Sequence, residues 1–574
     1  MSANPEPARQ PGPFDAGGAD AATAALPELH GGSRSVHGAF GAVTSVEPAA
    51  TRAGIAMLEQ GGNAVDAAVA VAYALAVTHP SAGNLGGGGF MLVRPPGGPT
   101  VAIDFRETAP QALTRDQFDA MIRAGGAGPV SIGVPGSVAG LELAHDRFGR
   151  LDRRTVLAAA IALAHGHRLG AHQAELLAWS YRALERDRAA RAIFGDPKQA
   201  KQPKHSGDML VQKDLAASLE RVAVSGAPGF YQGPTAQGLI GVSGGLLSAA
   251  DLGAYQAKVR EPLTFEYHGY TVETMPPPSA GGVVVAEILL ALQNLHAERF
   301  AHDSADELHF FLEASKRAQA ERRYGVVDPD ALSAEENQRR RARYLDPTSV
   351  LGVPIDPLHA TPASVVHPLY SEALRELEHT TQLSVADADG MVVSCTTTLS
   401  ASFGSKLVAP GTGVVLNNSV ASFASVGDNQ PLAGRRTTSS MAPTLVLAGG
   451  APVLVLGSPG GDTIPSTVVQ ILRHVIDHGE PLDVAVDAPR VHHGFVPDEV
   501  RYEPHNAPPK PVLDELTHRG HTVKKGKSAI GDANEILLQH GEAFAYADPR
   551  EGGLALAASK TEHKPASDAT SRTR

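Results

Sequence analysis

A threonine-rich stretch, residues 379–398, constrains the fold of this chain more than any other part of the sequence. It contains two runs of β-branched residues joined by the polar turn Asp387-Ala388-Asp389-Gly390. Runs of this kind, separated by a glycine-containing turn, are typical of two antiparallel strands. Hydroxyl side chains gather at both ends of the predicted hairpin. Because threonine is a good strand former, this pattern by itself indicates only a sheet.

Other motifs accompany the hairpin in a fixed order. They are Thr398-Leu399, Phe403-Gly404, Leu416-Asn417-Asn418, Ser439-Ser440-Met441-Ala442-Pro443-Thr444 and Gly457-Ser458-Pro459-Gly460-Gly461. Together with Thr380-Thr381 and Ser384, this series resembles the γ-glutamyltranspeptidase family of glutathione hydrolases and acylases, from about Val36 to Leu556. The resemblance implies an α+β fold, the four-layer αββα sandwich of N-terminal-nucleophile hydrolases. It also implies a proenzyme that cuts itself just before the nucleophilic threonine.

The chemistry of threonine explains why such a cut is needed. A threonine hydroxyl is a weak nucleophile that requires an adjacent base, and inside a chain the nitrogen of Thr380 is an amide. If its Oγ1 attacks the carbonyl carbon of His379, the amide becomes an ester that water hydrolyses. Thr380 then carries a free α-amine, whose reference pKa of about 7.7–8.0 suits a general base near neutrality. Cleavage between His379 and Thr380 would therefore create the catalytic base.

The resemblance assigns roles to further residues. Thr398 matches the second threonine of the family, which orients the nucleophile, and the backbone N–H groups of Gly460 and Gly461 match its oxyanion hole. The α-carboxylate of the substrate would be held by Arg106, Ser439 and Ser440, since a planar guanidinium suits bidentate carboxylate binding. Without the family, Arg106-Glu107 reads equally well as a surface ion pair.

The predicted ammonium site departs from the family pattern. Where transpeptidases carry an Asn, a Gln and an Asp, this chain has Ser400, Ser419 and Ser422, counted without gaps from Thr380. A serine trio can hydrogen-bond an ammonium group but cannot neutralise it, which should cost about 1.5–3 kcal/mol. Residues 423–438, 16 in number, are also too few for the lid loop of many members. We therefore expect an open pocket.

The resemblance implies an enzyme that cleaves γ-glutamyl or glutaryl-type amides through an ester on Thr380, with transfer of the acyl group to water or an amine. An acylase of the glutaryl or cephalosporin type, or a poly-γ-glutamate hydrolase that does not recognise the α-amine, is the alternative. Two remoter possibilities remain: a serine hydrolase using Ser243 in Gly241-Val242-Ser243-Gly244-Gly245, and a non-catalytic binding protein of the same fold.

The Ala-, Pro- and Gly-rich composition of residues 1–35 predicts a disordered tail. The resemblance implies a large subunit over 36–379 and a small subunit over 380–574, which together form one interwoven body. A net charge of −12 argues against nucleic-acid partners, and the single cysteine, Cys395, excludes an intramolecular disulfide. The apolar run 62–78 is too short for a membrane span. No signal peptide is visible, so a cytoplasmic location is expected, with the periplasm or secretion as alternatives if the start is misassigned.

Local patterns add expectations about individual elements. They predict a strand over Val36–Val46, helices over Pro48–Gln60 and Asn63–Thr78, and a glycine turn at 86–89 where backbones approach closely. This turn leads into a strand, so it is not a dinucleotide loop, and no cofactor is expected. His492 and His493 are neighbours that point to different faces and lack a zinc motif, so no metal is expected.

Overall fold

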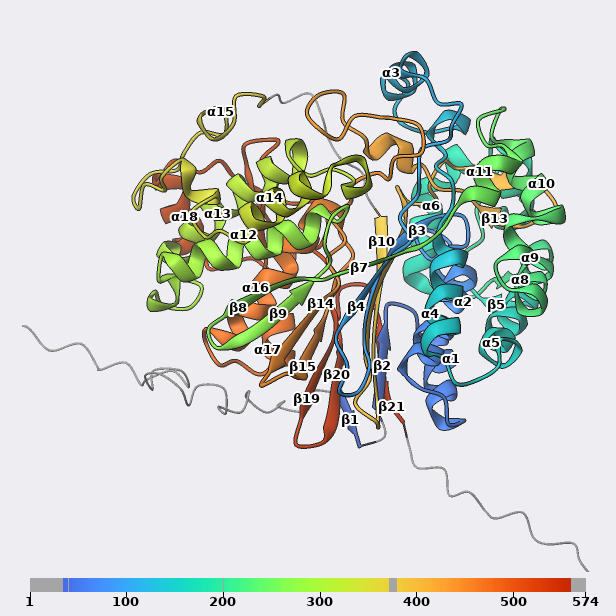
Figure 1. Ribbon diagram of the computed structural model, residues 1–574, viewed down its shortest axis with the longest axis horizontal. Coiled ribbons are helices and arrows are strands. Elements are labelled where there is room, and N and C mark those ends of the chain that lie inside the picture. Colours follow the sequence, from blue (N-terminus) through green and yellow to red (C-terminus); the bar gives the residue numbers. More distant parts are fainter. Residues whose placement is uncertain (1–34, 40, 200, 371–378, 559–574) are drawn as a thin grey trace, which may run out of the picture.

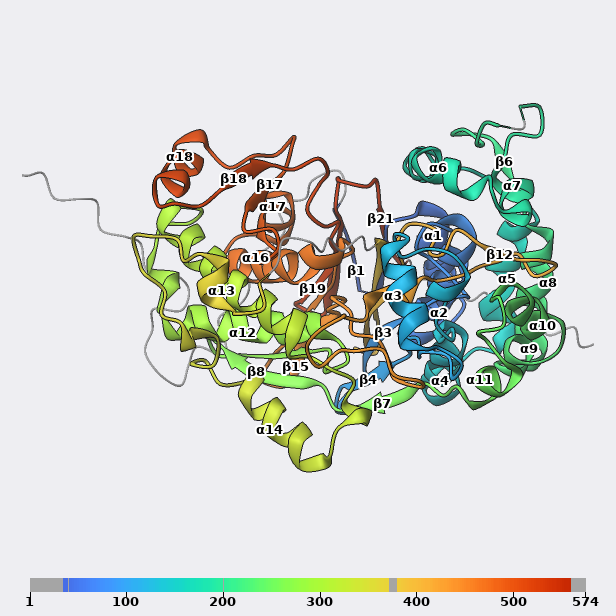
Figure 2. The ribbon, with the colours of Figure 1, turned by 90° about the horizontal axis from the view of Figure 1, so that it is seen from above.

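The computed structural model describes residues 35–39, 41–199, 201–370 and 379–558 of the 574-residue chain. Its centre is a pair of seven-stranded antiparallel sheets packed face to face, and helices cover both outer faces (Figure 1, Figure 2). This is the αββα arrangement expected from the sequence. The predicted tail, residues 1–35, lies outside the described residues, except that Ser35 begins the first strand.

The first sheet combines strands from the start, the middle and the end of the chain. Its order is β1 (Ser35–Gly38), β20 (Glu542–Ala547), β19 (Asn534–Gln539), β15 (Ala451–Leu456), β14 (Thr444–Ala448), β9 (Tyr270–Thr274) and β8 (Leu263–Tyr267). Its outer face is covered by α12 (Ala280–Asn294), α13 (Ala305–Tyr324), α16 (Ile464–Ile476) and α17 (Leu482–Asp487). One buried apolar cluster joins this sheet to its helices.

The second sheet carries the threonine-rich hairpin at its centre. Its order is β21 (Leu554–Ala557), β2 (Gly41–Ser45), β10 (His379–Asp387), β11 (Val392–Ser400), β3 (Gly88–Arg94), β4 (Val101–Asp104) and β7 (Lys258–Arg260). The helices on its outer side include α1 (Pro48–Glu59), α2 (Ala64–Thr78), α4 (Ser137–Phe148), α5 (Arg153–His165), α8 (Lys213–Ser225) and α10 (Gly233–Val242). A second apolar cluster fills this half of the molecule.

The remaining elements lie at the edges and ends of the sandwich. The helices are α3 (Arg115–Arg123), α6 (Ala171–Leu184), α7 (Arg188–Phe194), α9 (Pro228–Tyr231), α11 (Ala249–Ala254), α14 (Ala334–Tyr344), α15 (Ala363–Val366) and α18 (Lys510–His518). The short strands are β5 (His167–Arg168), β6 (Met209–Leu210), β12 (Val408–Ala409), β13 (Val414–Val415), β16 (Val491–His493), β17 (Val500–Tyr502) and β18 (Val523–Lys525). No helix among the described residues combines the length and apolar character that spanning a bilayer requires.

Each sheet combines strands that precede residue 379 with strands that begin at it or follow it. In the second sheet, β10 pairs with β2 on one side and with β11 on the other, and β11 then pairs with β3. Neither part of the chain contains a complete sheet of its own. Each part therefore depends on the other for its buried hydrogen bonds and apolar contacts.

Local sequence signals locate several elements correctly. The Asn63 side chain caps α2 by accepting from the backbone N–H groups of Val65 and Asp66, and Asp66 returns a bond to the Asn63 backbone. The predicted strand Val36–Val46 is wrong as a single element. It is divided into β1 and β2, which belong to different sheets.

Candidate active site

The hairpin sets Thr380 directly opposite Thr398. The β10–β11 pairing aligns Thr380 with Thr398 and Gln382 with Thr396, and its register shifts between His379 and Thr380. Shifts of this kind disrupt a ladder locally and are common beside active sites. On the far side of β11, a Cβ on Gly87 would lie 2.1 Å from the Thr398 carbonyl oxygen, so only glycine fits there. The close approach expected of the glycine turn is confirmed.

The Thr398 hydroxyl contacts the peptide group just before Thr380. Its Oγ1 donates to the carbonyl oxygen of His379 at 2.6 Å and accepts from the backbone N–H of Ser400 at 2.8 Å. The Thr380 hydroxyl is buried and makes no hydrogen bond within the described part of the chain. In this continuous chain Thr398 thus polarises the His379 carbonyl, whereas the sequence suggested that it would bind the nucleophile.

Two imidazoles beside this peptide group are buried. Burial, with smaller effects from His172 and Lys406, lowers the pKa of His379 to about 4. Burial also lowers the pKa of Lys406 to about 8 and holds the pKa of His79 well below its usual value. The His79 and His379 rings lie 6.0 Å apart. Both imidazoles are therefore neutral at pH 7, so neither places a positive charge beside the His379 carbonyl.

Removing the Thr398 hydroxyl tests its contact with the carbonyl. We expect Thr398→Val to slow self-cleavage by about a hundredfold or more, because one donor to a developing oxyanion is typically worth that much. The uncut fraction on a denaturing gel, followed over time after synthesis, measures the effect. Thr397→Val on the same strand is the matched control and should cleave at the normal rate. Equal rates for the two variants would refute a role for Thr398.

Arg106 is fully buried at the end of β4. Its guanidinium forms a 2.9 Å ion pair with Glu107 and donates to the Thr438 carbonyl oxygen at 3.3 Å, and its Nη2 lies 3.5 Å from Ser422 Oγ. Both side chains of the Arg106–Glu107 pair have no exposed surface, so the surface ion-pair interpretation is wrong. The Arg106 Nε is buried and has no hydrogen-bond partner in the described structure, which leaves donor capacity for a ligand.

Ser439 and Ser440 follow the carbonyl that Arg106 contacts. Ser440 Oγ accepts from Arg322 Nη1 at 2.9 Å, and Ser439 pairs with Ser279 at the start of α12. On α13, one turn before Arg322, Gln319 donates to the Asp462 carbonyl oxygen at 2.9 Å. The helix therefore ties the serine pair to the loop that contains Gly460 and Gly461.

The three serines of the predicted ammonium site converge. Ser400 Oγ lies 3.0 Å from Ser419 Oγ and 3.4 Å from Ser422 Oγ. Ser419 also donates to Glu107 Oε1 at 2.5 Å. The cluster thus includes the carboxylate of Glu107, which the sequence did not predict there. That carboxylate is already paired with Arg106.

Gly460 and Gly461 lie in the loop between β15 and α16, at the start of a short 3-10 turn. A Cβ on Gly457 would lie 2.4 Å from the side chain of Gln382, so a glycine there lets this loop approach β10. Backbone N–H groups at the start of a helix favour a developing negative charge. The position of the pair is compatible with an oxyanion hole.

The predicted substrate-binding side chains are buried in the described part of the continuous chain. Thr380, Ser400, Arg106 and Ser440 are each at most 3% exposed. Residues 371–378, which immediately precede the predicted cut, lie outside the described residues. An open pocket therefore remains a prediction for the cleaved form only.

The alternative nucleophile is engaged elsewhere. Ser243 is fully buried directly after α10, where its Oγ donates to the Ile240 carbonyl oxygen at 2.8 Å and accepts from Leu247 N–H at 3.0 Å. A nucleophile elbow needs a preceding strand, and here a helix precedes it. His492 and His493 contact different carboxylates, Asp462 at 3.3 Å and Asp498 at 3.1 Å, as expected for residues that point to opposite faces.

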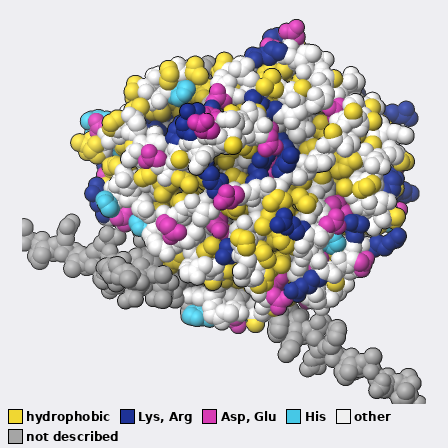
Figure 3. Space-filling model, in the orientation of Figure 1, with side chains coloured by type: hydrophobic (Ala, Val, Ile, Leu, Met, Phe, Trp, Pro, Cys, Tyr) yellow, Lys and Arg dark blue, Asp and Glu magenta, His cyan; other side chains and the backbone are white. Residues whose placement is uncertain are grey.

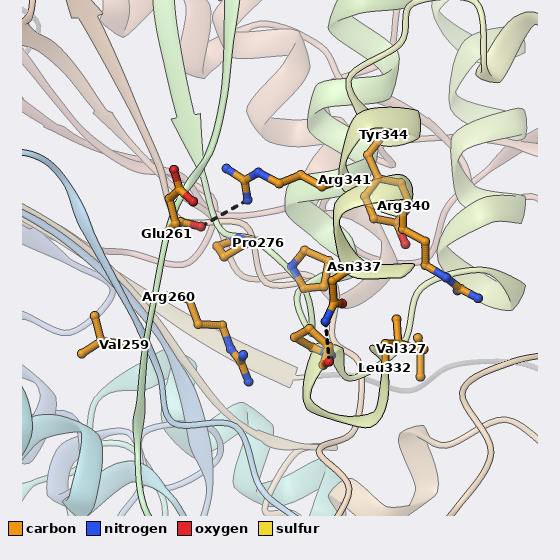
Figure 4. A pocket seen from close by; sticks show the side chains of 12 residues that line it. Val259, Arg260, Glu261, Pro276, Val327, Leu332, Asn337, Arg340, Arg341 and Tyr344 are labelled. Atoms are coloured by element: carbon orange, nitrogen blue, oxygen red, sulfur yellow. Dashed lines mark hydrogen bonds between the residues drawn. The ribbon is translucent and has the colours of Figure 1, made fainter. Parts of the chain in front are cut away.

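A pocket between β7 and α14 is separate from this site (Figure 4). Three arginines line it, and each is engaged: Arg260 with Asp104, Arg340 with Glu336, and Arg341 with the Glu261 carbonyl oxygen. Asp104 also accepts from the Arg106 backbone N–H at 2.9 Å. The wall of this pocket therefore supports the position of Arg106. On the molecular face shown in Figure 3, basic and acidic side chains are interspersed.

Comparison with known proteins identifies the arrangement. The family model described as gamma-glutamyltranspeptidase matches residues 50–558. The chain belongs to the γ-glutamyltranspeptidase family. It is 39% identical over 533 residues to a glutathione hydrolase proenzyme of Escherichia coli (strain K12), covering 89% of this chain and 90% of that protein. It is also 33% identical to the acylase ACY 1 proenzyme of Pseudomonas sp. (strain V22), covering 87% and 90%.

Solved structures of γ-glutamyltranspeptidase relatives share the fold. A cephalosporin acylase from Bacillus halodurans superposes with a TM-score of 0.79 at 26% identity, covering 92% of this chain and 97% of that one. A Helicobacter pylori gamma-glutamyltranspeptidase chain gives a TM-score of 0.52 at 33% identity, covering 57% and 96%. The predicted fold class, an autoprocessed N-terminal-nucleophile hydrolase with large and small subunits, is confirmed, and so is the assignment as an enzyme.

The sequence alone did not indicate two buried side chains that contact the predicted substrate-binding residues. Glu107 was recognised only as the neighbour of Arg106, and Arg322 lies in a helix of mixed charge with no distinguishing pattern. Charged residues are almost never fully buried unless they are paired, so local sequence favours exposure for both. The adjacency of Arg106 and Glu107 after a strand was the available signal. For Arg322, no local signal exists.

Proposed function

We propose that the chain cuts itself between His379 and Thr380 and then hydrolyses, or transfers, γ-glutamyl or glutaryl-type acyl groups from amides. The observation that carries the proposal is the 2.6 Å hydrogen bond from Thr398 to the carbonyl oxygen next to Thr380, whose own hydroxyl has no partner in the described structure. A polarised carbonyl beside an uncommitted hydroxyl provides the electrophile and the nucleophile that an internal acyl shift requires.

In the cutting step, Thr380 Oγ1 attacks the His379 carbonyl carbon, the C–N bond breaks, and the nitrogen takes a proton to become the α-amine. Water hydrolyses the resulting ester, which restores the Thr380 hydroxyl and leaves a carboxylate on His379. In each catalytic turnover, the free amine accepts the hydroxyl proton while Oγ1 attacks the substrate amide. The N–H groups of Gly460 and Gly461 would bind the oxyanion, and water or an amine would then release the acyl group.

The substrate end distant from the cleaved bond would meet two clusters. Arg106 with Ser439 and Ser440 supplies donors for a carboxylate, which a γ-glutamyl and a glutaryl group both possess at that end. The trio Ser400, Ser419 and Ser422 would face the α-amine. Because the nearest carboxylate, Glu107, is committed to Arg106, the α-amine should contribute little to binding.

Kinetics on a matched substrate pair test this assignment. We expect kcat/KM for a γ-glutamyl anilide and a glutaryl anilide to agree within about tenfold, because the site offers no unpaired carboxylate to form an ion pair with the α-ammonium group. A preference of about a hundredfold or more for the γ-glutamyl compound would show that the site recognises the α-amine, as a glutathione-type substrate requires. Failure to cleave either compound, by protein shown to be processed, would refute the acyl specificity itself.

A further inference from the structure

A cluster of histidines and carboxylates lies far along the chain from the catalytic threonine. His302 and Asp303 occupy the turn before α13, His474 lies in the last turn of α16, and Glu480 follows that helix. Both helices pack on α12 at the outer face of the first sheet (Figure 1, Figure 2). Ligand atoms of His302, Asp303 and His474 all lie within 4.8 Å of one another.

Glu480 contacts the Nδ1 atom of both imidazoles. One carboxylate oxygen lies 3.0 Å from His302 Nδ1, and the other lies 3.0 Å from His474 Nδ1. A carboxylate that accepts from Nδ1–H leaves Nε2 as the lone-pair donor, which is how histidine ligands of metal ions are usually oriented. One side chain is therefore placed to orient two histidines.

The atoms that remain free have the spacing of a metal site. His302 Nε2 and His474 Nε2 lie 3.3 Å apart, and oxygens of Asp303 lie 3.6 Å from each of them. Two ligands at about 2.0–2.1 Å from a tetrahedral Zn²⁺ are separated by roughly 3.3–3.4 Å. The two Nε2 atoms thus have the separation of adjacent ligands, and each lies near a different oxygen of the Asp303 carboxylate.

Neighbouring groups keep this face in place and leave it negatively charged. Glu307 accepts from the Asp303 backbone N–H at 2.5 Å and from His478 at 2.5 Å, and it pairs with Arg473. Carboxylates therefore outnumber the single arginine around the cluster. The side chains of His302 and Asp303 are 30% and 26% exposed, whereas that of His474 is 6% exposed, so one side of the cluster is open to water.

We propose that His302, His474 and Asp303 bind a divalent transition metal ion of the Zn²⁺ type, with water as the fourth ligand and Glu480 orienting both histidines. Two imidazole nitrogens favour such an ion over Mg²⁺ or Ca²⁺, which prefer oxygen ligands. This revises the expectation of no metal, which rested on His492 and His493. If the chain is cut after His379, the ion joins the two subunits, because two of its ligands precede that residue and the third follows it.

Zinc binding by the processed, full-length, tag-free protein tests the proposal. After loading with Zn²⁺ and gel filtration, we expect about one zinc per chain by mass spectrometry, and titration against a chromophoric chelator gives the affinity. His302→Ala and Asp303→Asn should each weaken binding by about a hundredfold or more. Glu480→Gln should weaken it by about ten- to a hundredfold, as typical for a group that orients a ligand.

His205→Ala is the matched control, since His205 faces Asp208 at 3.8 Å on the exposed surface and should leave zinc affinity unchanged. Circular dichroism and thermal melting identify variants that fail to fold, and Asp303→Asn preserves side-chain volume for that reason. Loading with Co²⁺ should give a visible absorption band that His302→Ala abolishes. Wild-type protein that binds zinc no more tightly than folded His302→Ala would overturn the proposal and identify the cluster as an ion-paired histidine network.

Discussion

Replacing Thr380 by alanine is expected to leave the chain uncut and inactive. The substitution removes the only atom proposed to attack both the His379 carbonyl and the substrate, so self-cleavage and amidase activity should fall together. Loss of a nucleophile typically costs at least about 10³-fold in rate. A denaturing gel should show one band instead of two, and hydrolysis of a γ-glutamyl anilide should approach the uncatalysed level.

Two controls make this result specific. Thr381→Ala changes the adjacent hydroxyl, which points to the other face of β10, and should cleave and react normally. Thr380→Ser keeps a hydroxyl and should retain cleavage at a reduced rate. Two bands from Thr380→Ala would exclude the proposed chemistry, as would a small fragment from the wild type that begins at any residue other than Thr380.

Two substitutions of Arg106 are expected to affect substrate binding and folding stability differently. Arg106→Lys keeps the positive charge beside Glu107 but loses the planar, bidentate donor, so KM for a γ-glutamyl anilide should rise by about ten- to a hundredfold. Arg106→Ala should additionally destabilise the fold, because it leaves the carboxylate of Glu107 buried and unpaired. Breaking a buried pair in this way typically costs about 3–5 kcal/mol. Enzyme kinetics and chemical denaturation measure the two effects.

The double variant Arg106→Ala/Glu107→Ala distinguishes these causes. It removes the unpaired charge, so much of the lost stability should return while KM stays high. If the double variant were as unstable as Arg106→Ala, the destabilisation would come from lost packing and not from charge. An unchanged KM in Arg106→Lys would show that Arg106 does not bind the substrate carboxylate.

The hairpin illustrates what local sequence can determine. Runs of β-branched residues on either side of Asp387–Gly390 predict two strands, and the ordered motifs identify the family and its fold. The polar cap at Asn63 likewise fixes the start of a helix, because a cap satisfies N–H groups only a few residues away. These features depend on contacts between residues that are near one another in the sequence, or on motifs retained as a set.

Other features were decided only when distant segments packed together. The burial of Glu107 and Arg322 and the division of Val36–Val46 between two sheets depend on contacts that no local pattern encodes. The hydrogen bond from Thr398 to the His379 carbonyl oxygen likewise depends on the pairing of two strands in the uncut chain.

The cluster formed by His302, Asp303, His474 and Glu480 has the same origin. Its members come from segments more than 170 residues apart, and α12 brings them together by packing against both α13 and α16. Sequence determined the chemistry that is available in this protein, since that depends on residue type and short spacing. Tertiary structure decided which groups meet, because hydrogen bonds and ion pairs act only over a few ångströms.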